Sequence, residues 1–313
     1  MGRRLYRSPV FTALAFLWFS PVAGQEQPSE SAQSRPAWHL ETLWSVALDA
    51  VRPVAVTVDL LGRVYVLDQA RARLTIFDSG GGVVHSLGRP GSAEDGRFLQ
   101  PTGVTAGPGF HVVIADAGNG RVVRYLTNVE GADYAFDKVI LDRSELAAGL
   151  FRPGAIAFDP GGGLAVADAE THQVFVLDEF ARVQKTLSGF GDMPGRLQEP
   201  SGLAYDRRFG LFVADARRGR IVVFDAFGNT RGDWPVGSRP LSEPRGVAVD
   251  RSGLVFVAES AAGRLTVMAN DGRIIAEMAL SEEPVDLAFG PEGDLYSVDA
   301  STKTLQRMRI HRP

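Results

Sequence analysis

The sequence predicts an all-β protein: a six-bladed β-propeller of four-stranded antiparallel blades, whose ring is closed by an N-terminal strand that completes the last blade. Three observations predict this fold. Six prolines recur at intervals of 40 to 52 residues, and an acid follows each proline by fifteen positions. The repeats contain short apolar runs typical of strands, and no long segment has a helical pattern. Repeats of this length are typical of propeller blades. The repeats begin near Pro53, Pro101, Pro153, Pro200, Pro244 and Pro284.

Each repeat is expected to supply its strands in the same order. The first strand follows the proline, as in residues 54–59, and a glycine turn comes after it. The second strand, such as residues 64–67, is apolar on both faces, so both faces must be buried. It ends at the acid, and the third strand begins five residues later. The fourth strand is the most variable, and residues 83–87 are one example.

The sixth repeat lacks a fourth strand, because the pattern stops near Ile310 after three strands. Residues 43–48 precede the first proline and have the composition of a strand. We therefore expect them to pair with the last repeat and close the ring. Closure removes exposed sheet edges and ties the two ends of the chain together.

The N-terminal segment resembles a targeting signal. Arg3, Arg4 and Arg7 precede an apolar run over residues 10–19, and small residues follow at 21–24. This order predicts a secretory signal peptide over residues 1–24, with an uncleaved anchor as the alternative. Residues 25–37 are polar and predict a flexible linker, so the propeller spans 38–313. We expect an exported protein, periplasmic or extracellular, with no membrane span after cleavage.

Composition excludes several kinds of chemistry. None of the 313 residues is cysteine, which excludes disulfides, thiolate metal ligands and cysteine nucleophiles. The formal net charge of −4 argues against general nucleic-acid binding through phosphate contacts. We expect a monomer.

The repeats resemble those of NHL-repeat propellers, which share their architecture with TolB-like and regucalcin-like proteins. The repeat pattern is Pro-x-Gly-Val-Ala-Val-Asp, then Gly-x-Val-x-Val-Ala-Asp/Glu, then Arg-Leu/Ile-x-Val. The pattern is clearest in residues 200–225 and 244–268. The Asn-His signature of that family is only partly present, as Asn119 and His172. The resemblance implies the fold, whereas the architecture hosts lyases, lactonases, sensors and binding modules.

The repeated charged residues are expected to be structural. Each acid should accept hydrogen bonds from turn N–H groups and pair with the arginine five residues later. A ring of metal ligands is the alternative, but six equivalent copies indicate an element of the fold. The acids are Asp68, Asp116, Asp168, Asp215, Glu259 and Asp299, and the arginines are Arg73, Arg121, Arg220 and Arg264.

The axial channel offers little predicted chemistry. The residues two positions after each proline should line its mouth, and five of the six are glycine or alanine. Asp286 is the carboxylate in this set, and a hydrogen bond to a loop is its structural interpretation. The five histidines occupy different repeat offsets, so they cannot converge on one metal. We therefore predict no catalytic residue, metal or cofactor. The six mouth residues are Ala55, Gly103, Ala155, Gly202, Gly246 and Asp286.

The main functional hypothesis is a non-enzymatic module that binds a protein, peptide or glycan through one propeller face. Residues 130–152 should form the longest loop and could cover this face with Tyr134, Phe136 and Phe151. One alternative is a metal-dependent enzyme, lactonase-like or lyase-like, with its site at the axial channel. Another is the sensor domain of an envelope complex. The candidate binding residues are Arg71, Asn119, His172, Arg217, Arg218, Arg245, Asp286 and Lys303.

Overall fold

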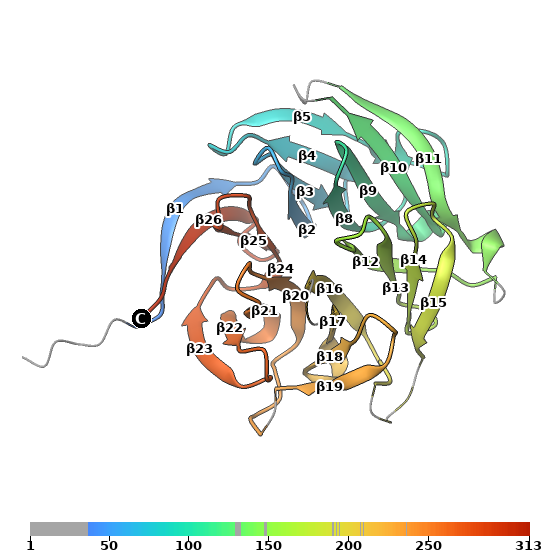
Figure 1. Cartoon of the computed structure of the whole chain (residues 1–313). Helices are drawn as coiled ribbons and strands as arrows, with labels where there is room; N and C mark the ends of the chain where they lie inside the picture. Colours follow the sequence, from blue (N-terminus) through green and yellow to red (C-terminus); the bar gives the residue numbers. More distant parts are fainter. Residues whose placement is uncertain are drawn as a thin grey trace, which may run out of the picture. The chain divides into compact units, whose positions relative to one another are not determined.

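Six four-stranded antiparallel sheets surround a common axis, which confirms the predicted six-bladed propeller (Figure 1). In every blade the strand that begins at the repeat proline is innermost, and the inner strands of neighbouring blades contact one another. This computed structural model describes residues 37–128, 133–146, 149–189, 191, 193, 195–206, 208, 210–235 and 237–313. The predicted signal peptide, and all but the last residue of the predicted linker, lie outside the described residues.

The blades follow the chain in order. Blade 1 contains β2 (Pro53–Val58), β3 (Val64–Asp68), β4 (Arg73–Phe77) and β5 (Val83–Leu87). Blade 2 contains β8 (Pro101–Gly107), β9 (His111–Asp116), β10 (Arg121–Thr127) and β11 (Tyr134–Asp142). Blade 3 contains β12 (Pro153–Phe158), β13 (Leu164–Asp168), β14 (Gln173–Leu177) and β15 (Val183–Ser188).

The second half repeats this arrangement. Blade 4 contains β16 (Pro200–Asp206), β17 (Gly210–Asp215), β18 (Arg220–Phe224) and β19 (Thr230–Trp234). Blade 5 contains β20 (Pro244–Val249), β21 (Val255–Glu259), β22 (Arg264–Met268) and β23 (Ile274–Ala279). Blade 6 contains β24 (Pro284–Phe289), β25 (Leu295–Asp299), β26 (Thr304–His311) and β1 (His39–Ala47).

Short elements complete the described chain. Two-residue strands β6 (Arg89–Pro90) and β7 (Arg97–Phe98) pair in the loop that enters blade 2. Four 3₁₀ turns follow outer or second strands: η1 (Ala117–Asn119), η2 (Arg143–Glu145), η3 (Ala216–Arg218) and η4 (Ser260–Ala262). None of the helical elements described is long and apolar enough to cross a membrane.

The ring closes as the sequence predicts. Strand β1 pairs antiparallel with β26, from His39 opposite His311 to Ala47 opposite Thr304. It is longer than the predicted residues 43–48. Blade 6 therefore combines the two ends of the described chain, and the blue and red strands lie side by side in Figure 1.

The core consists of apolar layers between neighbouring blades. The second strand of each blade is buried along all or nearly all of its length, as the two-sided apolar pattern predicts; β3 and β13 are buried throughout. Burying a Val, Leu or Ile side chain stabilises a fold by about 1.5–3 kcal/mol. The blade interfaces therefore hold the ring together without disulfides.

One predicted loop is a strand. Residues 134–142 of the segment expected to form a long loop over residues 130–152 are β11, the outer strand of blade 2, and η2 follows it. Tyr134 and Phe136 pack against the core between blades 1 and 2, and Phe151 is buried between blades 2 and 3. The expected aromatic cover over the propeller face is therefore wrong, because blade 2 uses these residues to complete its sheet.

Candidate functional site

The six repeated acids are buried inside the fold. Each accepts a hydrogen bond from a backbone N–H one or two residues before the proline of its own repeat. For Asp215 the donors are Gln198 and Glu199, at 3.1 and 2.9 Å. The acid thereby fixes the loop through which the chain enters each blade. All six side chains are almost inaccessible to solvent: Asp68, Asp116, Asp168, Asp215, Glu259 and Asp299.

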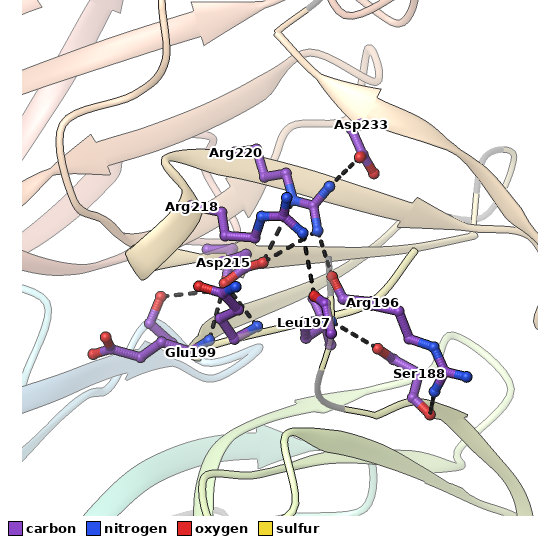
Figure 2. Close-up of polar contacts among 12 residues, drawn as sticks. Ser188, Arg196, Leu197, Glu199, Asp215, Arg218, Arg220 and Asp233 are labelled. Atoms are coloured by element: carbon purple, nitrogen blue, oxygen red, sulfur yellow. Dashed lines mark hydrogen bonds and ion pairs between the residues drawn. The ribbon is translucent and has the colours of Figure 1, made fainter. Parts of the chain in front are cut away.

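Three of the four repeat arginines contact the acid of their own blade. Arg121 and Arg264 lie 2.9 and 3.0 Å from Asp116 and Glu259. Figure 2 shows the blade 4 arrangement, in which Arg220 contacts Asp215, Asp233 and the Arg196 carbonyl.

Arg73 departs from the predicted pairing. Its guanidinium bonds Asp49 at 3.1 Å instead of Asp68. The Asp68 carboxylate already accepts four backbone N–H groups, from Val51, Arg52, Ala70 and Arg71. The acid in blade 1 is therefore satisfied without an arginine.

The candidate binding residues lie mainly on the turns between second and third strands, where several already have partners. Arg71 donates to the Asp49 carbonyl at 2.6 Å and also contacts its carboxylate. Asn119 donates to Asp116 at 2.7 Å. Arg218 donates to the Gly191 carbonyl at 3.2 Å (Figure 2).

The remaining residues of this set do not form one basic surface. Arg245 pairs with Glu243, and its guanidinium lies 3.9 Å from Glu199. Arg217 and Lys303 are exposed on turns of different blades. His172 adopts a left-handed backbone conformation in the blade 3 turn. Acidic partners therefore neutralise the positive charge around Arg71 and Arg245.

A cavity of about 120 Å³ lies between the inner strands, on the axis of the ring. Five of the six predicted mouth residues line it: Ala55, Gly103, Ala155, Gly202 and Asp286. Gly246 is the exception, because it faces the neighbouring strand. A Cβ at Gly246 would lie 2.6 Å from the Asp286 Cα, and one at Gly202 would lie 2.1 Å from the Arg245 carbonyl oxygen. Only glycine allows the inner strands to approach so closely.

Asp286 joins the last blade to the first. One carboxylate oxygen accepts from Val56 N of β2 at 2.8 Å, and the other from Leu287 N at 2.9 Å. The residue is half-buried and lines the channel. Burial among the inner strands raises the pKa of Asp286 to about 7, although the two N–H groups act in the opposite direction.

Two hydroxyl groups in the channel were missed by the sequence analysis. Thr102 Oγ1 donates to the Pro153 carbonyl at 2.6 Å, and Ser201 Oγ donates to the Pro244 carbonyl at 2.7 Å. Each links an inner strand to the next blade. Their shared position directly after a repeat proline was the available signal.

The donor set of the channel does not fit a divalent metal centre. Such ions take six or more oxygen ligands, or three or four protein side chains for zinc. Among the channel-lining residues described, Asp286 alone carries a carboxylate, and both its oxygens already accept N–H groups. Within the described ranges no three His, Cys, Asp or Glu side chains form a group suited to a metal ion.

The histidines are dispersed, with one exception. His85 of blade 1 stacks on Tyr134 of blade 2, and His111 of blade 2 contacts Phe158 of blade 3. His39 and His311 stack at 4.4 Å where β1 pairs with β26. Their different repeat offsets concealed this pair, because ring closure brings the two chain ends together.

Comparison with known proteins supports the predicted resemblance. No protein-family model matches the sequence. The chain is 35% identical over 119 residues to the human E3 ubiquitin-protein ligase NHLRC1, covering 37% of this chain and 27% of that protein. The chain therefore spans about a quarter of this relative. The NHL-type propeller predicted from the repeats is confirmed.

Solved structures with the same fold include several enzymes. A gluconolactonase from Xanthomonas campestris has a TM-score of 0.67 at 16% identity, covering 90% of this chain and 94% of that one. A luciferin-regenerating enzyme has a TM-score of 0.67 at 14% identity, over 88% and 95% of the two chains. The virginiamycin B lyase of Staphylococcus aureus has a TM-score of 0.60 at 13% identity, over 88% and 89%.

These neighbours contradict the predicted non-enzymatic binding module. The solved structures described above are enzymes, which favours the alternative that places an enzyme site at the axial channel. Identities of this size establish the common fold, and the activity of this chain is a separate question.

Proposed function

We propose that the chain is an enzyme that opens a cyclic ester at the axial channel, with Asp286 as the general base. The observation that supports this most directly is a channel-facing carboxylate whose pKa is raised to about 7 by burial. A general base is most effective when its pKa lies near the working pH. The proposal concerns Asp286 and involves no metal.

The geometry leaves Asp286 free to take a proton. An ionised carboxylate has about four acceptor positions. The N–H groups of Val56 and Leu287 occupy one position on each oxygen. The remaining positions can accept a hydrogen bond from water in the channel, which has room for a few water molecules within its 120 Å³.

The reaction follows from this arrangement. Asp286 accepts a proton from water while the water oxygen bonds to the ester carbonyl carbon. The tetrahedral intermediate then collapses, the ring C–O bond breaks, and Asp286 returns the proton to the departing ring oxygen. The product is an open-chain hydroxy acid. Asp286 lies two residues into β24, about 7 Å from the start of the strand, so the ester ring itself would sit at the mouth.

The neighbours with this fold indicate which substrates to test first. Two are named as gluconolactonases and others as lyases. Sugar lactones are therefore the first substrates to test. Hydrolysis adds the mass of water to the product, whereas a lyase reaction by elimination leaves the mass unchanged. Mass spectrometry of the product distinguishes these outcomes.

The decisive experiment compares Asp286→Asn with wild type on a panel of sugar lactones, with proton release as the assay. Asp286→Asn keeps the size of the side chain and removes the base. We expect kcat/KM to fall by about 10²- to 10⁴-fold. Asp299→Asn is the control, because it lies on the neighbouring strand and binds only turn groups. It should lower Tm and leave the activity of the folded fraction unchanged. Unaltered turnover in Asp286→Asn would refute the proposal.

We also propose that the protein is exported, because its first 24 residues have the order of a signal peptide. Mass spectrometry of the chain recovered outside the cytoplasm is expected to find Gln25 as its first residue. Recovery of a chain that still begins at Met1 would instead support an uncleaved anchor.

A further inference from the structure

A second cavity lies between blades 1 and 2, at the end of the blades opposite the repeated acids. It measures about 100 Å³ and is enclosed by the turn after β2 and the turn after β8. Its lining combines a polar floor with an apolar rim. The residues are Asp59, Leu60, Leu61, Arg63, Tyr65, Gly107, Gly109, Phe110, His111 and Thr127.

The polar floor is a hydrogen-bonded network in which one buried nitrogen of Arg63 lacks an acceptor among the described residues. Arg63 is only 8% exposed; its Nε donates to Asp59 at 2.6 Å and its Nη1 to the Asn128 carbonyl at 3.0 Å. Within the described part of the chain, Arg63 Nη2 is buried and has no partner. Tyr65 is fully buried, and its hydroxyl donates to Asp59 and accepts from Tyr134. Buried donors are almost always paired, so Nη2 needs an acceptor.

The charge of this floor favours a neutral acceptor. Asp59 compensates the charge of Arg63 directly. Burial lowers the pKa of His111, and its neighbour Arg124 acts in the same direction, so the imidazole stays neutral at pH 7. An anionic ligand would approach Asp59 without a free positive charge to balance it. A carbonyl oxygen would accept from Nη2 and add no charge.

The rim is apolar and exposed. Leu60 and Leu61 are 78% and 47% exposed, and Phe110 is 40% exposed beside them. Phe110 also holds a left-handed backbone conformation, with φ at 57°. A bulky residue rarely adopts this conformation, and such residues concentrate at binding sites. The fold thus presents an aromatic ring next to the polar floor at some cost in backbone strain.

This network occurs once in the ring. The positions equivalent to Arg63 in the other repeats hold His111, Gly163, Gly210, Leu254 and Asp294. The repeated acids are elements of the fold because all six blades share them. By the same reasoning, the Arg63 network is not a repeated element of the fold, because only blade 1 has an arginine at this position.

We propose that this cavity binds a small neutral molecule in which a carbonyl oxygen is carried on an apolar body. The oxygen would accept from Arg63 Nη2, and the body would contact Leu60, Leu61 and Phe110. An apolar cavity of about 150 Å³ holds the six heavy atoms of benzene, so 100 Å³ admits about four heavy atoms, such as a carbonyl group and the carbons beside it, and the rest of the body would lie against the exposed rim. The site is independent of Asp286 and of the reaction proposed for the channel.

The test uses cyclopentanone as the probe and backbone amide chemical shifts of the ¹⁵N-labelled protein as the measurement. Methylenecyclopentane is the matched ligand, because it has the same shape and no oxygen. We expect saturable shifts confined to residues 60–63 and 109–111, with binding of methylenecyclopentane at least fivefold weaker. Absence of saturable shifts would show that water alone satisfies Nη2 and would overturn the proposal. If cyclopentanecarboxylate bound more tightly than cyclopentanone, the proposal that the ligand is neutral would be overturned.

Two variants locate the interaction. Arg63→Lys keeps the charge opposite Asp59 and removes Nη2, so it should weaken cyclopentanone binding at least tenfold. Arg182→Lys is the control, because Arg182 pairs with Asp178 at the same four-residue spacing but on the exposed surface. Phe110→Gly relieves the backbone strain and removes the aromatic rim, so it provides a test even if Arg63→Lys unfolds. Its binding should weaken several-fold, and unchanged binding in both variants would overturn the proposal.

Discussion

Asp286 and Asp299 lie on neighbouring strands of blade 6, yet their surroundings shift their pKa values in opposite directions. Burial acts to raise the pKa of Asp299, but hydrogen bonds from Thr302 and Glu283 outweigh it and hold the pKa below its usual range. Burial raises the pKa of Asp286 to about 7, because only two N–H groups oppose it. The number of donors around a buried carboxylate decides whether it stays ionised or becomes a base near pH 7.

Glu259, the repeated acid of blade 5, shows the same principle with a larger number of partners. Glu259 accepts from Arg239, Arg264, Thr266 and Ser242, and these contacts outweigh burial and lower its pKa to about 2. Such a carboxylate is a fixed anion that stabilises a turn. The comparison therefore assigns the turn acids to the fold and leaves Asp286 for chemistry.

The largest expected effect is on the pH dependence of the reaction. Because the base must be ionised, kcat/KM for lactone opening should rise with pH and level off above about 7, the pKa of Asp286. Below that value the rate should fall about tenfold per pH unit, since the ionised fraction falls tenfold. Steady-state kinetics from pH 5 to 9 measure the profile. A rate that is constant between pH 6 and 8 would separate Asp286 from the reaction.

The sequence predicted the fold well because propeller blades repeat. A proline, an acid fifteen positions later and a two-sided apolar strand recur at fixed offsets, and chain closure follows from the incomplete sixth repeat. The fixed offset after the repeat proline also predicted Asp286 as the carboxylate of the channel mouth. The hydrogen bond that Asp286 accepts from Val56 N could not be predicted, because Val56 is 230 residues away and belongs to another blade.

Features that break the repeat were the ones missed. The outer strand β11 was taken for a loop, because the fourth strands share no fixed pattern. The pairing of Arg73 with Asp49 depends on a residue that precedes the first repeat. Arg63 has no counterpart at its repeat offset in the other blades, so comparison of the repeats gave it no role. Single-copy contacts between blades depend on three-dimensional packing that periodicity does not encode.

The second expected effect concerns the strand that positions Asp286. An added Cβ at Gly246 would meet the Asp286 backbone at 2.6 Å, so Gly246→Ala must displace β24. We expect a loss of about 2 kcal/mol in the free energy of unfolding and at least a tenfold loss in kcat/KM. Urea unfolding and lactone kinetics measure the two effects.

Gly154→Ala is the matched control for this substitution. Gly154 also lies on an inner strand, but its added Cβ would find its nearest atom at an ordinary 3.6 Å. Its kinetics should equal those of wild type. Equal activity in Gly246→Ala would show that the position of β24 does not control the site.

The third expected effect is on the pH dependence of stability, and here the two aspartates should differ in sign. The folded pKa of Asp286 lies above its unfolded value, so the native state keeps a proton between about pH 4 and 7 that the unfolded chain has released. Its contribution to the free energy of unfolding therefore falls as pH rises through this window, by about 1.4 kcal/mol per pH unit at most. For Asp299 the folded pKa is depressed, so its contribution is present above pH 4 and is lost as pH falls. Urea unfolding of wild type, Asp286→Asn and Asp299→Asn from pH 2 to 8 separates the two. The stability difference between Asp286→Asn and wild type should grow in favour of the variant as pH rises, because neutral asparagine removes the cost of ionisation. A constant difference would mean that Asp286 is already ionised at pH 4 and belongs with the turn acids.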